Sequence, residues 1–185
     1  SLVALENGEY RFGSAAAGAE HVVTGLKNLL RDHRGRSAPM VDFGPERRPL
    51  ADVLAAWFAW LLTQVRADLA ARGLPHRGPL PVVLTVPQNC HDVQRRATRA
   101  AAASAGWRVR DILNEPTAAA LSLALHGATV RIEPGEHLAV WDCGGGTFDA
   151  SLVQCLAPGR YREVDSEGVR DCGGGDVDRA LLALA

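Results

Sequence analysis

The chain has 185 residues, of which 47% are hydrophobic and 5% aromatic, and its 20 basic and 21 acidic side chains give a net charge of −1. This composition excludes intrinsic disorder, because nearly half of the residues can enter a core. The balanced charge argues against a nucleic-acid-binding protein, which normally carries a basic excess. No secretory signal is visible, and the most apolar stretch, residues 50–62, is shorter than the about 20 residues that span a bilayer. We therefore expect a soluble, cytoplasmic protein.

Lysine is nearly absent from the chain. Of the 20 basic residues, 19 are Arg, and Lys27 is the only Lys. A composition biased this strongly toward Arg suggests that Lys27 has a role that Arg does not fill. The cysteines form no C-x-x-C pair and match no zinc-binding pattern, so we expect reduced thiols. They are Cys90, Cys143, Cys155 and Cys172.

The first 72 residues predict short strands followed by helices. Residues 1–19 predict one or two strands, and residues 24–31 a brief helix that carries Lys27. Residues 32–49 are rich in Gly and Pro, which predicts an irregular connection. Residues 50–72 have helical apolar spacing.

The sequence also predicts where that last helix ends and which of its side chains enter the core. Gly73 follows it directly, which is typical of a helix C-terminus. Trp57 and Trp60 lie on its apolar side, and we interpret them as core residues rather than as part of a cofactor site.

Strands and helices alternate after a turn-rich linker. Residues 82–86 are apolar and β-branched and end at a proline, which predicts a buried strand. A helix is expected over about 92–105, a strand over 108–113, and a helix from Pro116 to residue 126, since proline is favoured in the first helical turn.

The last third of the chain predicts a hairpin, a further strand and a helix. The strands are expected over 138–141, 147–155 and 160–165, and the helix over 176–184. The whole order predicts a mixed α/β fold, with a possible lobe boundary near 127–137.

Three consecutive glycines, Gly144, Gly145 and Gly146, separate the two strands of the hairpin. A structural turn that needs positive φ is the simpler interpretation, but one or two glycines would satisfy it. Three in a row expose several backbone N–H groups, which can converge on an anion such as phosphate. Asp142 comes just before the turn, where its carboxylate could hold a metal-bound water. Thr147 comes just after the turn, where its hydroxyl could reach a terminal phosphate.

Two further features have both a structural and a functional interpretation. A second run, Gly173–Gly175, precedes Asp176 and the last helix; it is either a simple turn or a helix N-terminus that favours phosphate. Glu115 precedes Pro116 at the start of a helix, where it is either a favourable first-turn charge or a functional carboxylate.

Taken together, these motifs resemble those of the heat shock protein 70 (DnaK-type) chaperone family. Residues 140–149, VWDCGGGTFD, resemble its second phosphate motif, and residues 114–120, NEPTAAA, its connecting motif. Residues 84–97 and 173–178 resemble its strand–helix segment and its glycine–acidic turn. Residues 25–30, GLKNLL, are similar to the segment with the family's catalytic lysine.

The resemblance implies an actin-like ATPase (ribonuclease H-like) fold in which two α/β lobes close on Mg-ATP. The chain would then cover part of lobe I and the start of lobe II. Residues 1–79 would be the peripheral part of lobe I, 80–130 its core with the crossover helix, and 131–185 the first part of lobe II with the phosphate hairpin.

The resemblance also implies roles for the residues that bind the nucleotide. Gly144, Gly145, Gly146 and Thr147 would hold the β- and γ-phosphates of ATP or ADP. Gly174 would lie near the phosphates.

Catalysis would involve the remaining matched residues. Lys27 would neutralise γ-phosphate charge and help to place the attacking water. Asp142 and Glu115 would act on Mg²⁺ through water, Asp142 would also help to orient the nucleophile, and Thr147 would contact the terminal phosphate. Pro87 and Arg95 match positions that relay the nucleotide state toward the peptide-binding domain.

The chain departs from the family pattern in several places. Nothing like the family's first phosphate hairpin precedes the Lys27 segment, and the adenosine motif and peptide-binding domain are absent, so the sequence looks like an internal part of the domain. Gly175 stands in place of an acidic residue, and Val177 in place of an aromatic one. An incomplete sheet would expose an edge, which favours self-association.

Three functions remain open from the sequence. The first is an ATP-hydrolysing chaperone that acts on unfolded client peptides with co-chaperones. The second is a divergent nucleotide-binding switch or scaffold with little turnover. The third is another actin-like class, such as a sugar kinase or a filament protein, which the NEP motif at 114–116 disfavours.

Overall fold

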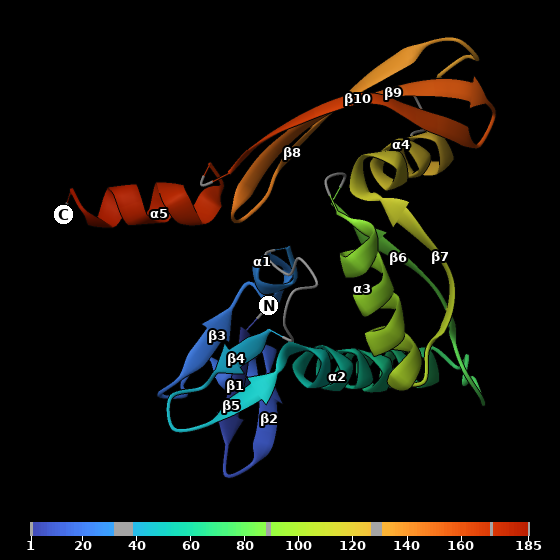
Figure 1. Cartoon of the computed structure of the whole chain (residues 1–185). Helices are drawn as coiled ribbons and strands as arrows, with labels where there is room; N and C mark the ends of the chain where they lie inside the picture. The colour runs from blue at the N-terminus through green and yellow to red at the C-terminus, as the bar shows by residue number, and fades with distance from the viewer. Residues whose placement is uncertain (1, 32–38, 88–89, 127–130, 171, 185) are drawn as a thin grey trace. The chain divides into compact units, whose positions relative to one another are not determined.

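The computed structural model shows a mixed α/β chain, as predicted, that divides into two compact units (Figure 1). The first unit comprises residues 1–84 and 90–112, and the second comprises residues 85–89 and 113–185. The boundaries expected at 79/80 and 130/131 stay predictions. The structure describes residues 2–31, 39–87, 90–126, 131–170 and 172–184.

The first unit begins with a small antiparallel sheet. Strand β1 (Leu2–Glu6) lies between β2 (Glu9–Phe12) and β3 (Val22–Thr24), and a 3-10 turn, η1 (Gly13–Ala16), follows β2. The one or two strands predicted over residues 1–19 correspond to β1 and β2, whereas β3 is too short to give a sequence pattern. Helix α1 (Leu26–Arg31) follows, as expected.

A second hairpin corrects the prediction of an irregular connection over 32–49. Strands β4 (Met40–Asp42) and β5 (Arg47–Pro49) pair with each other, while residues 32–38 lie outside the described part of the chain. Val41 and Phe43 are each 1% exposed, so burial of these two side chains outweighs the abundance of turn-forming residues.

The core of the first unit forms around α2 (Leu50–Ala71), which packs on α3 (Asp92–Ser104). Trp57 and Trp60 pack against this core, as predicted, and the predicted end of α2 is confirmed because Gly73 adopts φ +72° just beyond it. The largest apolar side chains of the core are Val3, Phe12, Leu26, Val41, Phe43, Leu50, Val53, Leu54 and Phe58.

Strands β6 (Pro81–Val86) and β7 (Arg108–Asn114) pair with each other, and the division between the two units falls within both of them. The sequence predicted both strands to within one residue at each end. Val86 is buried, whereas Pro81, Val83 and Thr85 are exposed, so only part of the expected burial is present within the described residues.

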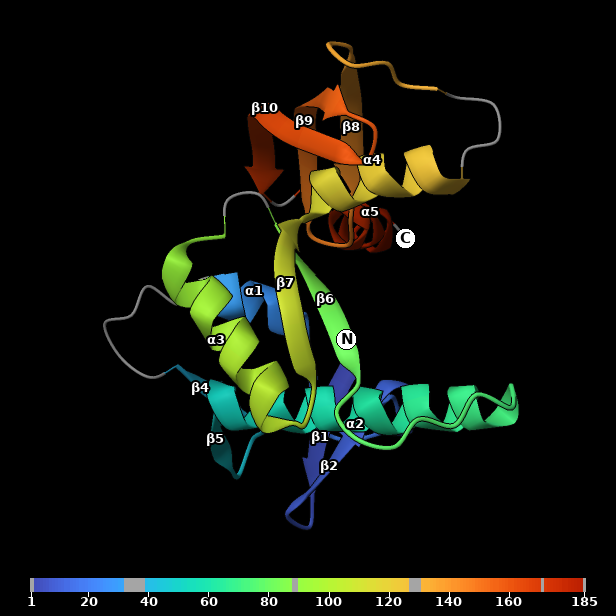
Figure 2. The same ribbon diagram turned by 90° about the vertical axis from the view of Figure 1, so that its right-hand side faces the viewer.

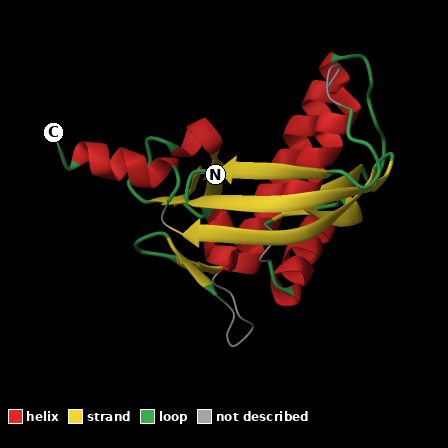
Figure 3. Ribbon diagram, turned by 90° about the horizontal axis from the view of Figure 1, so that it is seen from above, coloured by secondary structure: helices red, strands yellow, loops and turns green. Residues whose placement is uncertain are grey.

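The second unit is a three-stranded antiparallel sheet with two helices. Strands β8 (His137–Cys143), β9 (Thr147–Ala157) and β10 (Arg160–Arg170) lie in the order β10-β9-β8, side by side in Figure 3. Helix α4 (Glu115–His126) lies against all three strands (Figure 2), and α5 (Gly174–Leu182) follows β10.

Alternation along β9 defines the covered face of this sheet. Ser151, Val153 and Cys155 are buried on that face, whereas Leu152 and Leu156, which alternate onto the other face, are exposed. Strand β10 continues to Arg170, five residues beyond the predicted end, because it pairs with β9 along nearly its whole length. Helix α5 begins at Gly174, two residues before the expected start.

Candidate phosphate-binding site

The triple-glycine turn connects β8 to β9. The N–H of Gly144 donates to the carbonyl of Thr147 at 3.0 Å, which closes the turn around Gly145 and Gly146. Within the described ranges, the N–H groups of Gly145 and Gly146 have no hydrogen-bond partner. Neither glycine adopts positive φ. The turn therefore does not need glycine for its backbone conformation, and it leaves two adjacent amide donors available to an anion.

The second glycine run packs directly on this turn. The N–H of Gly174 donates to the Gly144 carbonyl, and that of Gly175 to the Gly145 carbonyl, each at 2.9 Å. A Cβ at Gly173 would lie 2.4 Å from the Gly146 nitrogen, so only glycine fits there. The structural interpretation of this run is thereby supported, and a contact of Gly174 with phosphate stays a prediction.

Two aspartates occupy opposite positions of the β8–β9 strand pair where the hairpin ends. Asp142 on β8 is the cross-strand partner of Asp149 on β9, and alternation places both on the sheet face that α4 covers. The Thr147 hydroxyl donates to Asp149 Oδ2 at 2.9 Å. Like charges directly opposite each other destabilise a strand pair, and a bound cation would offset that repulsion. The two aspartates thus bring negative charge to the strand ends beside the turn.

Asp149 is a candidate site residue that the sequence did not single out. Its Oδ1 would lie only 2.2 Å from a Cβ at Gly168, the residue opposite it on β10. The glycine at 168 thus leaves room for the carboxylate. The sequence did contain a signal for this residue. A hairpin whose two central residues are Gly145 and Gly146 pairs position 142 with position 149.

Glu115 is the first residue of α4 and belongs to the same unit as the turn. In the described part of the chain, no three His, Cys, Asp or Glu side chains gather closely enough to hold a metal ion. Direct coordination of a metal by such a trio is therefore not seen, and the expected contact of Asp142 and Glu115 with Mg²⁺ through water stays a prediction.

Lys27 lies in α1, as predicted, within the first unit. Its side chain is outside the described part of the structure, so its expected role at the γ-phosphate stays a prediction. The four cysteines form no disulfide in the described structure, and Cys155 is buried, while their reduced state stays a prediction. No helix among the described residues is long and apolar enough to span a membrane.

Comparison with known proteins identifies the family. The model of the family described as Hsp70 protein matches residues 59–184, more than half of the chain. Chaperone protein DnaK of Akkermansia muciniphila is 38% identical over 128 residues, which are 69% of this chain and 18% of that protein.

Further relatives match shorter segments. A ribosome-associated molecular chaperone of Eremothecium gossypii is 44% identical over 46% of this chain and 14% of its own length. Chaperone protein DnaK of Burkholderia cenocepacia is 48% identical over 39% of this chain and 11% of its own. The matched part of the chain thus spans less than a fifth of the length of these relatives. Because the family model covers more than half of the chain, the chain belongs to the Hsp70 family.

Proposed function

We propose that the chain is part of the nucleotide-binding domain of an Hsp70-type chaperone and that the Gly144–Gly146 turn binds the phosphate chain of ATP or ADP. The observation that carries this proposal is the pair of unpartnered amides at Gly145 and Gly146 among the described residues, backed by the second glycine run. Hydrogen bonds from neutral donors to charged oxygens contribute about 1.5–3 kcal/mol each. Two such bonds therefore make a substantial part of a phosphate site.

The residues around the turn fit a role in positioning the nucleotide. Asp142 and Asp149 provide the negative charge that a magnesium ion bound to the phosphates requires, and Thr147 holds Asp149 in place. Magnesium would supply charge neutralisation on the phosphates. Lys27 and Glu115 are assigned to the same reaction by their match to the family motifs.

In the complete protein, this site would belong to an actin-like fold that closes on Mg-ATP, hydrolyses it and thereby controls binding of unfolded client peptides with co-chaperones. The proposal includes a cytoplasmic location, where thiols such as those of the four cysteines remain reduced. The outer strands β8 and β10 each have one strand partner within the described residues, which leaves edges for the proposed self-association.

The test follows the amide signals of an isotopically labelled chain by NMR during titration with inorganic triphosphate. We expect the Gly145 and Gly146 signals to shift most, while that of Gly159, in the turn at the other end of β9, stays unchanged as a matched control. ATP should compete with triphosphate, whereas adenosine should not. Equal shifts at all three glycines, or none at any of them, would refute the proposed site.

Turnover distinguishes the chaperone ATPase from a nucleotide-binding switch. We expect a single-turnover measurement on the full-length protein to show ATP hydrolysis that Lys27→Ala abolishes while binding remains. Binding of Mg-ATP without hydrolysis would support the switch. Hydrolysis at an unchanged rate in Lys27→Ala would remove Lys27 from the mechanism.

A further inference from the structure

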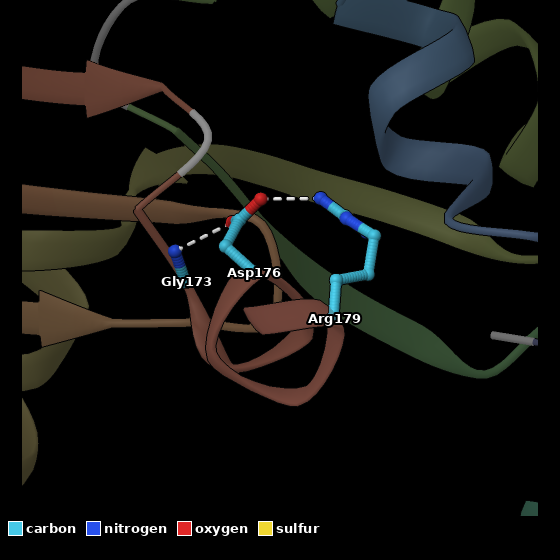
Figure 4. A network of polar contacts seen from close by, with 3 residues as sticks. All are labelled: Gly173, Asp176 and Arg179. Carbon is cyan, nitrogen blue, oxygen red and sulfur yellow. Dashed lines mark hydrogen bonds and ion pairs between the residues drawn. The ribbon is translucent and has the colours of Figure 1, made fainter. Parts of the chain in front are cut away.

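A polar network lies at the start of α5, beside the glycine turn (Figure 4). Asp176 Oδ2 accepts the N–H of Gly173 at 2.8 Å, and Asp176 Oδ1 forms an ion pair with Arg179 one helical turn later. The Asp176 side chain is only 19% exposed, whereas that of Arg179 is 72% exposed. Asp176 is thus held between a backbone amide and a guanidinium group.

This network fixes the segment that contacts the turn. Gly173 is anchored by the Asp176 carboxylate, and the next two amides, those of Gly174 and Gly175, donate to the carbonyls of Gly144 and Gly145. The Arg179 guanidinium folds back over this segment, since its Nη1 would lie 3.8 Å from a Cβ at Gly175.

The direction of these hydrogen bonds determines where the free amides of the turn point. In a trans peptide unit, the carbonyl and the following N–H point in opposite directions. Because the Gly144 and Gly145 carbonyls point toward α5, the N–H groups of Gly145 and Gly146 point away from it. The second glycine run therefore orients both donors of the turn toward one side.

We infer that Asp176 and Arg179 are positioning residues that set the affinity of the turn for the phosphate chain without touching it. This inference rests on the proposed phosphate-binding function of the turn. Preorganised donors bind an anion more tightly, because no conformational entropy is lost when the anion arrives. Arg179 also offsets the charge of Asp176, which would otherwise repel a phosphate.

The experiment measures the dissociation constant of inorganic triphosphate, from the Gly145 and Gly146 amide signals, for four variants at a temperature where all are folded. Asp176→Ala removes the acceptor for the Gly173 amide, and we expect affinity to fall about tenfold, as for loss of one charged hydrogen bond. Asp176→Asn keeps an acceptor oxygen and should restore affinity to within about threefold of the original. Rescue by Asn would not occur if the carboxylate acted only through its charge.

The third variant, Arg179→Gln, removes the compensating charge. We expect a loss of about threefold at low ionic strength that disappears near 1 M salt, where the screening length is about 3 Å. The matched control is Arg162→Gln, since Arg162 on β10 is exposed and bonds to Gln154, away from the turn. It should leave the affinity unchanged.

The outcomes separate this inference from the proposed function. If the unaltered chain binds no triphosphate, the proposed function and the inference both fail. If it binds and Asp176→Ala binds equally well, only the inference fails. Should Asp176→Ala unfold α5, the salt-dependent loss in Arg179→Gln decides, and its absence overturns the inference.

Discussion

Replacing Gly173 with alanine tests whether the two glycine runs depend on each other. The new Cβ would lie 2.4 Å from the Gly146 nitrogen, 2.6 Å from the Gly145 carbonyl carbon and 2.7 Å from the Gly144 oxygen. All three are backbone atoms, so no side chain can move aside. Gly173 has φ −113° and ψ −177°, which alanine adopts freely, so the effect comes from this contact alone.

The size of the effect follows from the distances. Restoring ordinary contact, at 3.4 Å or more, moves the two segments apart by about 1 Å. The hydrogen bonds from Gly174 and Gly175, now 2.9 Å long, would then exceed hydrogen-bonding range. Losing both costs about 1–3 kcal/mol, which corresponds to an increase of about 5- to 150-fold in local opening.

Amide hydrogen exchange at Gly175 measures this opening. We expect exchange there to accelerate in Gly173→Ala by the factor given above, while the amides of β9 remain protected. The control is Gly145→Ala, because nothing lies within 4 Å of a Cβ at that position. Unchanged exchange at Gly175 in Gly173→Ala would show that the two glycine runs are not held together as described.

Three further substitutions have defined outcomes. Gly168→Ala places a Cβ 2.2 Å from Asp149 Oδ1 and so displaces this carboxylate. We expect the magnesium concentration needed for half-maximal ATP binding, measured by calorimetry, to rise. An unchanged concentration would exclude a role for the position of Asp149. Trp107→Phe removes the Nε1–H that donates to the Phe58 carbonyl at 2.9 Å, which should cost about 0.5–1.5 kcal/mol and lower Tm by about 1–6 °C in a thermal melt; an unchanged Tm would show that this bond adds nothing. Burial raises the pKa of the Tyr10 hydroxyl, so the folded state holds this proton more tightly than the unfolded state does. The stability that the protonated hydroxyl contributes is complete below about pH 10, and it is lost as the pH rises through the folded pKa. Tyr10→Phe should therefore lose less stability than the original chain between about pH 9 and about pH 11 in denaturant titrations, and equal losses would contradict the shift.

Local sequence patterns determined most of the helices and strands. The β-branched run of β6, the helical spacing of α2 and the glycine after it are features of a few adjacent residues, and local conformational preferences act over that range. Where burial of two side chains outweighed local composition, as at Val41 and Phe43 in the β4–β5 hairpin, the pattern predicted an irregular segment and was wrong.

The sequence by itself determined that the Gly144–Gly146 turn carries exposed amides, since three side chains are absent there. Only the tertiary structure decided that the second glycine run packs on this turn and that its amides donate hydrogen bonds to the turn's carbonyls. It likewise placed Asp149 over Gly168. Such contacts join residues far apart in the chain, and their geometry depends on how β8, β9 and β10 pair, which no local preference specifies.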